Sequence, residues 1–195
     1  LMIKFNIISI YILIILASLS VVEFIQISKR IFSKFYFKFF SSTIFIIYLT
    51  FFCYVFVIFI SYPQLKIILY SLLFGCVASD VGGFIVGKIF KGPKLTKISP
   101  NKTYSGAIGS IIFTCFAISS SLFLLTNNFT YIVLLTSVLI SISCQIGDLF
   151  FSFLKRKAKL KDTGSFFPGH GGVLDRIDGI LFGVPSGIIF LSVFI

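Results

Sequence analysis

Six long runs of apolar residues constrain this chain more than any other feature of its sequence. They lie near residues 5–22, 41–61, 65–86, 105–126, 129–151 and 179–195. A helix needs about 20 consecutive apolar residues to cross the hydrocarbon core of a bilayer. The runs are continuously apolar, whereas the strands of a membrane β-barrel alternate apolar and polar residues. We therefore expect an all-α fold, a polytopic integral membrane bundle with about six transmembrane helices.

Composition excludes a soluble globular fold. Only 12% of the residues are charged, whereas a soluble domain is about 25% charged. The sequence predicts one integral membrane domain over residues 1–195, with N-terminal hydrophobic helices in 1–70 and a part richer in Gly, Asp, Pro and Lys in 71–195. We expect the chemistry in that second part. The chain begins with Leu rather than Met, which indicates a non-standard start or a fragment of a longer protein.

Basic residues gather between alternate apolar runs and indicate an orientation. The net charge is +11, and most of the cations lie in three loops. These cations are Lys29, Arg30, Lys34 and Lys38; Lys88, Lys91, Lys94, Lys97 and Lys102; and Lys155, Arg156, Lys157, Lys159 and Lys161. Loops rich in Lys and Arg stay on the cytoplasmic side of a membrane. We therefore expect these three loops in the cytoplasm and both termini outside.

One carboxylate, Asp80, lies about two turns inside an apolar run. A charged residue at mid-depth in a bilayer costs about 2.5 to 3.5 kcal/mol, so it indicates a functional site. Four small residues recur around it on one helix face, at Gly75, Ser79, Gly83 and Gly87. They predict close packing against a neighbouring helix, which does not account for Asp80 itself.

The loop after this helix offers ammonium groups and hydroxyls to a phosphate. Residues 88–106 hold five lysines, and Ser99 and Thr103 are each placed to cap the following helix. The amides at a helix N-terminus also favour an anion. Taken alone, the lysines favour a plain topology signal over a phosphate site.

The segment 145–179 concentrates the remaining polar residues. On a continuing helix, Asp148, Ser152 and Lys155 share one face, and Asp175 shares a face with Asp178. Several carboxylates beside many cations would suit a hard divalent metal that holds a polyphosphate. Between the two helices, glycines surround His170, the only histidine. A simple turn, an interfacial ion pair and a structural histidine are the alternatives.

This segment resembles the C-terminal signature of the phosphatidate cytidylyltransferases, also called CDP-diacylglycerol synthases. The residues at the family's spacing are Gln145, Gly147, Asp148, Ser152, Lys155, Arg156, Lys161, Asp162, Gly164, Pro168, His170, Gly171, Gly172, Asp175, Arg176 and Asp178. A second, looser block comprises Ser79, Asp80, Gly87, Lys88, Ser99, Pro100, Lys102, Thr103 and Gly106. The resemblance covers roughly residues 73–195.

The resemblance implies a nucleotidyltransferase of phospholipid biosynthesis, which converts CTP and phosphatidic acid to CDP-diacylglycerol and pyrophosphate. It implies Mg²⁺ as cofactor, with a second cation left open, and a bacterial cell (inner) membrane with the active site on the cytoplasmic side. The implied catalytic residues are Asp148, Asp175, Lys155, Arg156, Lys161, His170 and Arg176. The implied substrate-binding residues are Lys102, Ser99, Thr103, Ser152, Gly171 and Gly172. The implied metal ligands are Asp148, Asp175, Asp178 and Asp80.

Several alternatives stay open at this stage. The expected partners are CTP, phosphatidic acid and membrane lipids, with no nucleic acid, and a homodimer is left open. A related enzyme acting on an isoprenoid alcohol or an ether lipid shares the chemistry but not the C-terminal motif. A transporter of lipids or anions would need polar residues through the whole bilayer, whereas the acidic residues gather near one side. A non-catalytic, truncated relative of the enzymes is the third alternative.

Overall fold

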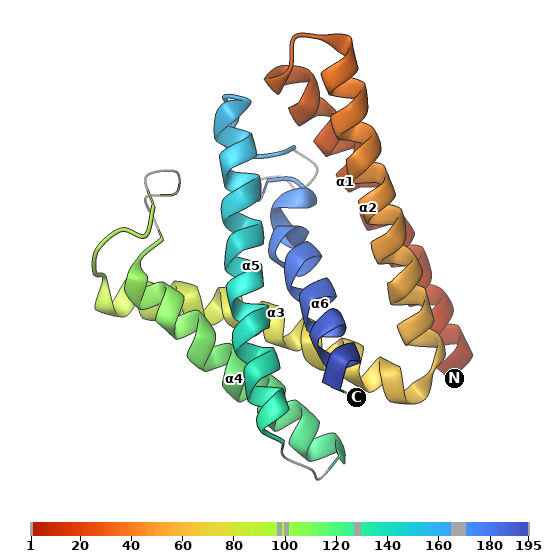
Figure 1. Cartoon of the computed structure of the whole chain (residues 1–195), viewed down its shortest axis with the longest axis vertical. Coiled ribbons are helices and arrows are strands. Elements are labelled where there is room, and N and C mark those ends of the chain that lie inside the picture. The colour runs from red at the N-terminus through yellow and green to blue at the C-terminus, as the bar shows by residue number, and fades with distance from the viewer. Residues whose placement is uncertain (1, 97–98, 100–101, 127–129, 165–170, 195) are drawn as a thin grey trace. The chain divides into compact units, whose positions relative to one another are not determined.

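The computed structural model describes residues 2–96, 99, 102–126, 130–164 and 171–194. Within these residues the chain forms helices and no named strand (Figure 1). The helices are α1 (Met2–Ile31), α2 (Phe35–Ser61), α3 (Pro63–Phe90), α4 (Tyr104–Thr126), α5 (Tyr131–Lys157) and α6 (Leu174–Phe194). All six are long and apolar enough to cross a membrane. The prediction of an all-α fold with six transmembrane helices is confirmed.

The described residues divide into two compact units, and each unit is built from two separate segments. The first unit comprises Leu1–Pro63 and Phe151–Ile177, and the second comprises Gln64–Phe150 and Asp178–Ile195. Helices α5 and α6 therefore contribute residues to both units. That the whole chain is one membrane domain, with parts at 1–70 and 71–195, stays a prediction.

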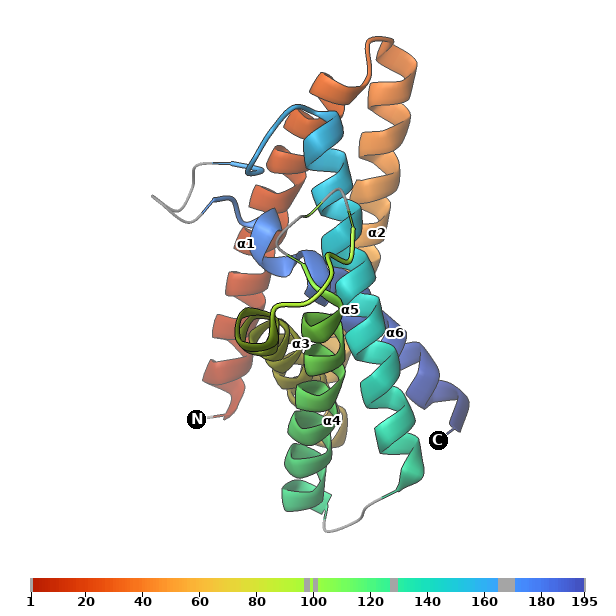
Figure 2. The ribbon, with the colours of Figure 1, turned by 90° about the vertical axis from the view of Figure 1, so that its left-hand side faces the viewer.

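In the first unit, α1 and α2 pack side by side in opposite directions (Figures 1 and 2). The Asn6 side-chain amide, near the start of α1, donates a hydrogen bond of 3.3 Å to the carbonyl of Ile60, near the end of α2. The rings of Phe24 and Phe45 stack with their centroids 4.0 Å apart. The rings of Phe45 and Phe151 meet edge to face, with their centroids 6.3 Å apart. The part of α5 that belongs to this unit, which begins at Phe151, therefore packs on α2.

In the second unit, α3 and α4 approach closely through small residues, as the sequence predicted. The Ser110 hydroxyl donates to the backbone carbonyl of Ser79 at 2.8 Å, and Thr114 lies 3.5 Å from the carbonyl of Gly75. A Cβ atom added to Gly82 would lie 2.5 Å from the Cβ of Phe113, so only glycine allows this approach. Ser79 also shares a hydrogen bond of 3.2 Å with Ser141 of α5. Ser79, the residue before Asp80, is thus hydrogen-bonded to both α4 and α5.

Within the same unit, α5 and α6 also meet backbone to backbone. A Cβ on Gly147 would lie 2.6 Å from the carbonyl oxygen of Asp178. Figure 2 looks along α3 and shows α4 and the lower part of α5 running across its axis. The residue after Gly147 is Asp148, so this contact fixes the helix turn that carries a predicted site residue.

Candidate active site

Three charged residues that the sequence singled out come together in the second unit. Lys102 Nζ forms an ion pair with the carboxylate of Asp148 on α5. Asp80 on α3 interacts electrostatically with both Asp148 and Lys102. Lys102 and Asp148 are partly exposed and Asp80 is exposed. Two carboxylates beside one ammonium leave an excess of negative charge, which a hard cation would balance.

The backbone around Lys102 is held on both sides. The Leu95 N–H donates to the Lys102 carbonyl at 2.7 Å, and Lys94 pairs with Thr103 in an isolated antiparallel bridge. The Thr103 hydroxyl accepts a hydrogen bond of 3.1 Å from the Gly106 N–H and so caps α4. Thr103 is therefore the residue of the predicted pair that acts as the cap, while the Ser99 carbonyl accepts from the Lys102 N–H at 3.1 Å. Both the N–H and the carbonyl of Lys102 are therefore hydrogen-bonded to the backbone.

Asp178 belongs to the same unit but is buried, with 7% of its surface exposed. One of its carboxylate oxygens accepts from the Gly179 N–H at 2.8 Å. Asp178 and Asp80 both interact electrostatically with the buried thiol of Cys144. Across the described part of this unit, His, Cys, Asp and Glu form no group of three that could hold a metal ion. The metal ligands therefore stay a prediction.

In the first unit, the predicted site residues Lys155 and Asp175 form a partly buried ion pair. Lys155 Nζ lies 2.7 Å from Asp175 Oδ1, and the two side chains are 13% and 11% exposed. The other oxygen of Asp175 accepts from the Thr163 N–H at 2.8 Å and from the Gly172 N–H at 3.0 Å. Three donors thus occupy this carboxylate. The arrangement holds the two ends of the glycine-rich segment against α6.

The other predicted cations of this unit lie at its surface. Lys161, Arg156 and Arg176 are exposed, and Arg156 donates to the Leu160 carbonyl at 3.4 Å. Ser152 on α5 is partly exposed. Gly171 has a φ of 83°, a backbone conformation that favours glycine. His170, with Pro168 and Gly169, lies outside the described residues.

A comparison of the whole sequence with known protein families gives a match over almost the whole chain. A sequence model described as "Cytidylyltransferase family" matches residues 2–194. The chain belongs to this family. It is 39% identical over 121 residues to the phosphatidate cytidylyltransferase of Mycobacterium leprae, a match that covers 62% of this chain and 38% of that protein.

Two further relatives show the same pattern of partial coverage. The phosphatidate cytidylyltransferase of Helicobacter pylori strain J99 is 46% identical over 116 residues, which are 59% of this chain and 43% of that protein. The one from Rickettsia felis is 38% identical over 133 residues, or 63% of this chain and 58% of that protein. The chain thus spans about 40% to 60% of the length of these relatives. Its relatives are bacterial, and the chain is a multi-pass membrane protein.

One buried residue of this family member was not among the predicted site residues. Glu23 on α1 is only 6% exposed, and it accepts hydrogen bonds from Thr163, Val173 and Leu174 at 2.7 to 2.9 Å. A signal for it was present in the sequence, because Glu23 is the only acidic residue before Asp80. A carboxylate in a membrane helix indicates function wherever it occurs.

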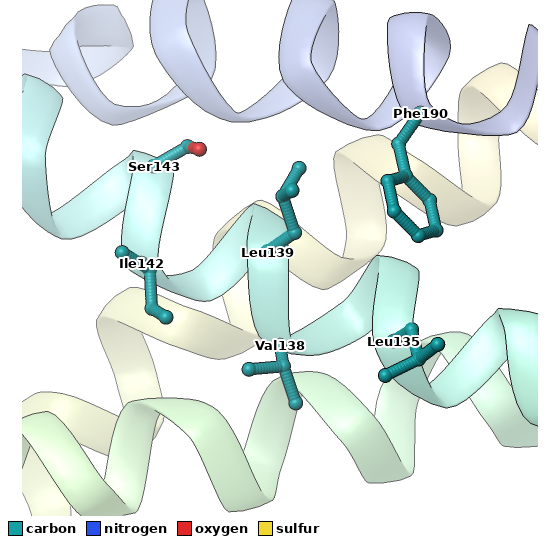
Figure 3. A pocket seen from close by; sticks show the side chains of 6 residues that line it. All are labelled: Leu135, Val138, Leu139, Ile142, Ser143 and Phe190. Carbon is teal, nitrogen blue, oxygen red and sulfur yellow. The ribbon is translucent and has the colours of Figure 1, made fainter. Parts of the chain in front are cut away.

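A pocket of about 520 Å³ opens on α5 and α6 in the second unit (Figure 3). Its lining residues are Leu135, Val138, Leu139, Ile142, Ser143 and Phe190. Figure 3 shows their side chains as aliphatic and aromatic groups beside the single hydroxyl of Ser143. This lining suits a hydrocarbon chain rather than a nucleotide, because it offers no charged group to a phosphate.

Proposed function

We propose that this chain contains the catalytic part of a phosphatidate cytidylyltransferase. The reaction joins CTP to phosphatidic acid and yields CDP-diacylglycerol and pyrophosphate for phospholipid biosynthesis. The observation that carries the proposal is the Lys102–Asp148 ion pair with Asp80 beside it. These residues come from three separate segments, two of them within membrane helices, in a chain of the cytidylyltransferase family.

The chemistry suits residues that position and neutralise charge. A phosphate oxygen of phosphatidic acid attacks the α-phosphorus of CTP, and the bond from that phosphorus to the bridging oxygen breaks to release pyrophosphate. Such transfers need alignment of the two reactants and compensation of negative charge, with little covalent help from the protein. Lys102, beside Asp148, would supply that compensation, and the family resemblance assigns Lys155, Lys161, Arg156 and Arg176 to phosphate as well. The lipid supplies the nucleophile.

Mg²⁺ is the cofactor that we propose. Asp80 and Asp148 are the residues we assign to it first, because they provide hard oxygen donors and an excess of negative charge. Asp175 and Asp178 are assigned after them, because their oxygens already accept hydrogen bonds. A bound Mg²⁺ would supply stabilisation of charge on the phosphate oxygens. The proposal leaves room for a second cation beside Mg²⁺.

We propose the inner membrane as the location, with the active site on the cytoplasmic side. The support is the clustering of Lys and Arg in alternate loops and the cytoplasmic supply of CTP. Phosphatidic acid would then reach Lys102 and Asp148 from the membrane, and CTP from the water.

The test is a direct assay of the chain in lipid nanodiscs. Radiolabelled CTP and phosphatidic acid are supplied with Mg²⁺, and lipid-soluble label is measured as CDP-diacylglycerol. We expect product with the unmutated chain and a strong loss with Asp148→Asn. The exposed Lys94→Ala in the Lys102 loop is the matched control and should retain activity. An unmutated chain that inserts correctly yet makes no product would contradict the proposal and favour a non-catalytic relative.

A further inference from the structure

Glu23 places a carboxylate of α1 among the backbone amides at the start of α6. Its Oε1 accepts from the Val173 N–H at 2.9 Å, and its Oε2 accepts from the Leu174 N–H at 2.8 Å. The Thr163 hydroxyl donates to the same Oε2 at 2.7 Å. A buried carboxylate is stabilised when several N–H and O–H groups donate to it. These contacts tie the first helix of the chain to residues that lie 140 and more positions later.

Asp175 accepts hydrogen bonds from the same two stretches of the chain as Glu23. Thr163 donates its N–H to Asp175 and its hydroxyl to Glu23. On the other side of the glycine-rich segment, Gly172 donates to Asp175 and Val173 donates to Glu23. We call Glu23 and Asp175 the loop anchors. Between them they hold both ends of the segment that the family signature covers.

Two glycines of the signature leave room for this contact. A Cβ atom on Gly164 would lie 2.7 Å from Glu23 Oε1, and one on Gly172 would lie 2.5 Å from Glu23 Oε2. Real Cβ atoms do not approach oxygen so closely, so any other residue at 164 or 172 would displace the Glu23 carboxylate from this position. Glycine at 164 and 172 is an observation independent of the hydrogen bonds, and it points to the same carboxylate.

We propose that Glu23 is a positioning residue for the cytidylyltransferase reaction. It touches no reacting atom. It acts by fixing the loop ends, and thereby the placement of Lys161 and of the Lys155–Asp175 ion pair. The role in the reaction rests on the function proposed above, while the anchoring of the loop does not.

The key variant is Glu23→Gln, which keeps the shape of the side chain. One oxygen becomes an NH₂ group, so at least one of the Val173 and Leu174 N–H groups loses its acceptor. The matched control is Ser20→Ala. Ser20 is buried one turn away on α1, and its hydroxyl donates within its own helix, to the Leu16 carbonyl at 2.7 Å.

Hydrogen–deuterium exchange in nanodiscs tests the anchoring without any assay of activity. We expect peptides that contain Val173 and Leu174 to exchange at least about tenfold faster in Glu23→Gln, since tenfold corresponds to the loss of about one hydrogen bond. Ser20→Ala should exchange as the unmutated chain does. Unchanged exchange in Glu23→Gln would overturn the proposal. This result does not depend on turnover, so it is separable from a failure of the proposed function.

Kinetics then tests the link to the reaction. We expect Glu23→Gln to lower kcat/KM for CTP about tenfold or more, and Ser20→Ala to change it less than about twofold. Thr163→Val removes the hydroxyl that donates to Glu23, so the double variant should lose less than the sum of the single losses. Faster exchange with unchanged kcat/KM would overturn the positioning role. Fully additive losses would overturn the claim that Thr163 and Glu23 act through one contact.

Discussion

Removing the Lys102 ammonium is the perturbation whose effect the structure defines best. Lys102 Nζ pairs with Asp148, and the two side chains are 23% and 34% exposed. An ammonium carries three N–H groups, so Lys102 can donate to Asp148 and to a phosphate together. A charge-assisted contact in a partly buried site is worth about 1.5 to 3 kcal/mol. At about 1.4 kcal/mol per factor of ten, Lys102→Ala should lower kcat/KM for CTP about 10- to 150-fold.

The assay is steady-state CDP-diacylglycerol formation in nanodiscs at saturating phosphatidic acid, with CTP varied. Lys102→Arg keeps the charge but changes the donor geometry, so it should lie between the unmutated chain and Lys102→Ala. Lys94→Ala removes an exposed lysine whose described contact to Thr103 is a backbone bridge, and it should stay within about twofold. If Lys102→Ala also stayed within about twofold, with normal insertion, the ion pair would not belong to the active site.

Three further results are expected. Asp175→Asn should lower turnover at least about a hundredfold, and it should lower the thermal unfolding temperature. It breaks a partly buried ion pair with Lys155 and replaces one of two hydrogen-bond acceptors by an NH₂ donor. The exposed Asp162→Asn is its control, and equal behaviour of the two would refute this. Lys161→Ala and Arg176→Ala should each lower kcat/KM for CTP by a factor equivalent to about 1.5 to 3 kcal/mol, without affecting insertion. Unchanged kinetic constants would indicate that Lys161 and Arg176 only anchor the loop to lipid headgroups. A cysteine at Lys94 should react with an impermeant thiol reagent only after the cells are opened; labelling in intact cells would reverse the topology.

The helices were predictable because a helix that crosses a bilayer needs a long run of apolar residues, which is visible in the sequence. Their ends were not, because a helix continues as long as its backbone hydrogen bonds do, whether or not the side chains are apolar. The first run was expected to end at residue 22, but α1 continues to Ile31, through Lys29 and Arg30 in its last turn. Cations are favourable at a helix C-terminus. Likewise α6 begins at Leu174, before the predicted residue 179, with Asp175 in its first turn.

The residues of the candidate site could be chosen from the sequence, but their contacts could not. Local spacing placed Asp148 and Lys155 on one helix, and α5 confirms this. Spacing carries no information on which distant residue faces them, so neither the Lys102–Asp148 pair nor the Lys155–Asp175 pair was predicted. Glu23 was passed over for the same reason, because its partners lie 140 to 151 positions later in the chain.

That separation along the chain has a consequence for how the protein is made. During synthesis Glu23 is translated before Thr163, Val173 and Leu174, which lie 140 to 151 positions later. A carboxylate without donors is costly within a bilayer, so α1 should settle at its final depth only when these residues arrive. In a ribosome-bound chain stopped at residue 160, Glu23 should therefore be more accessible to a water-soluble carboxyl reagent than in the finished protein. The final placement of α1 would in this way follow the synthesis of α6.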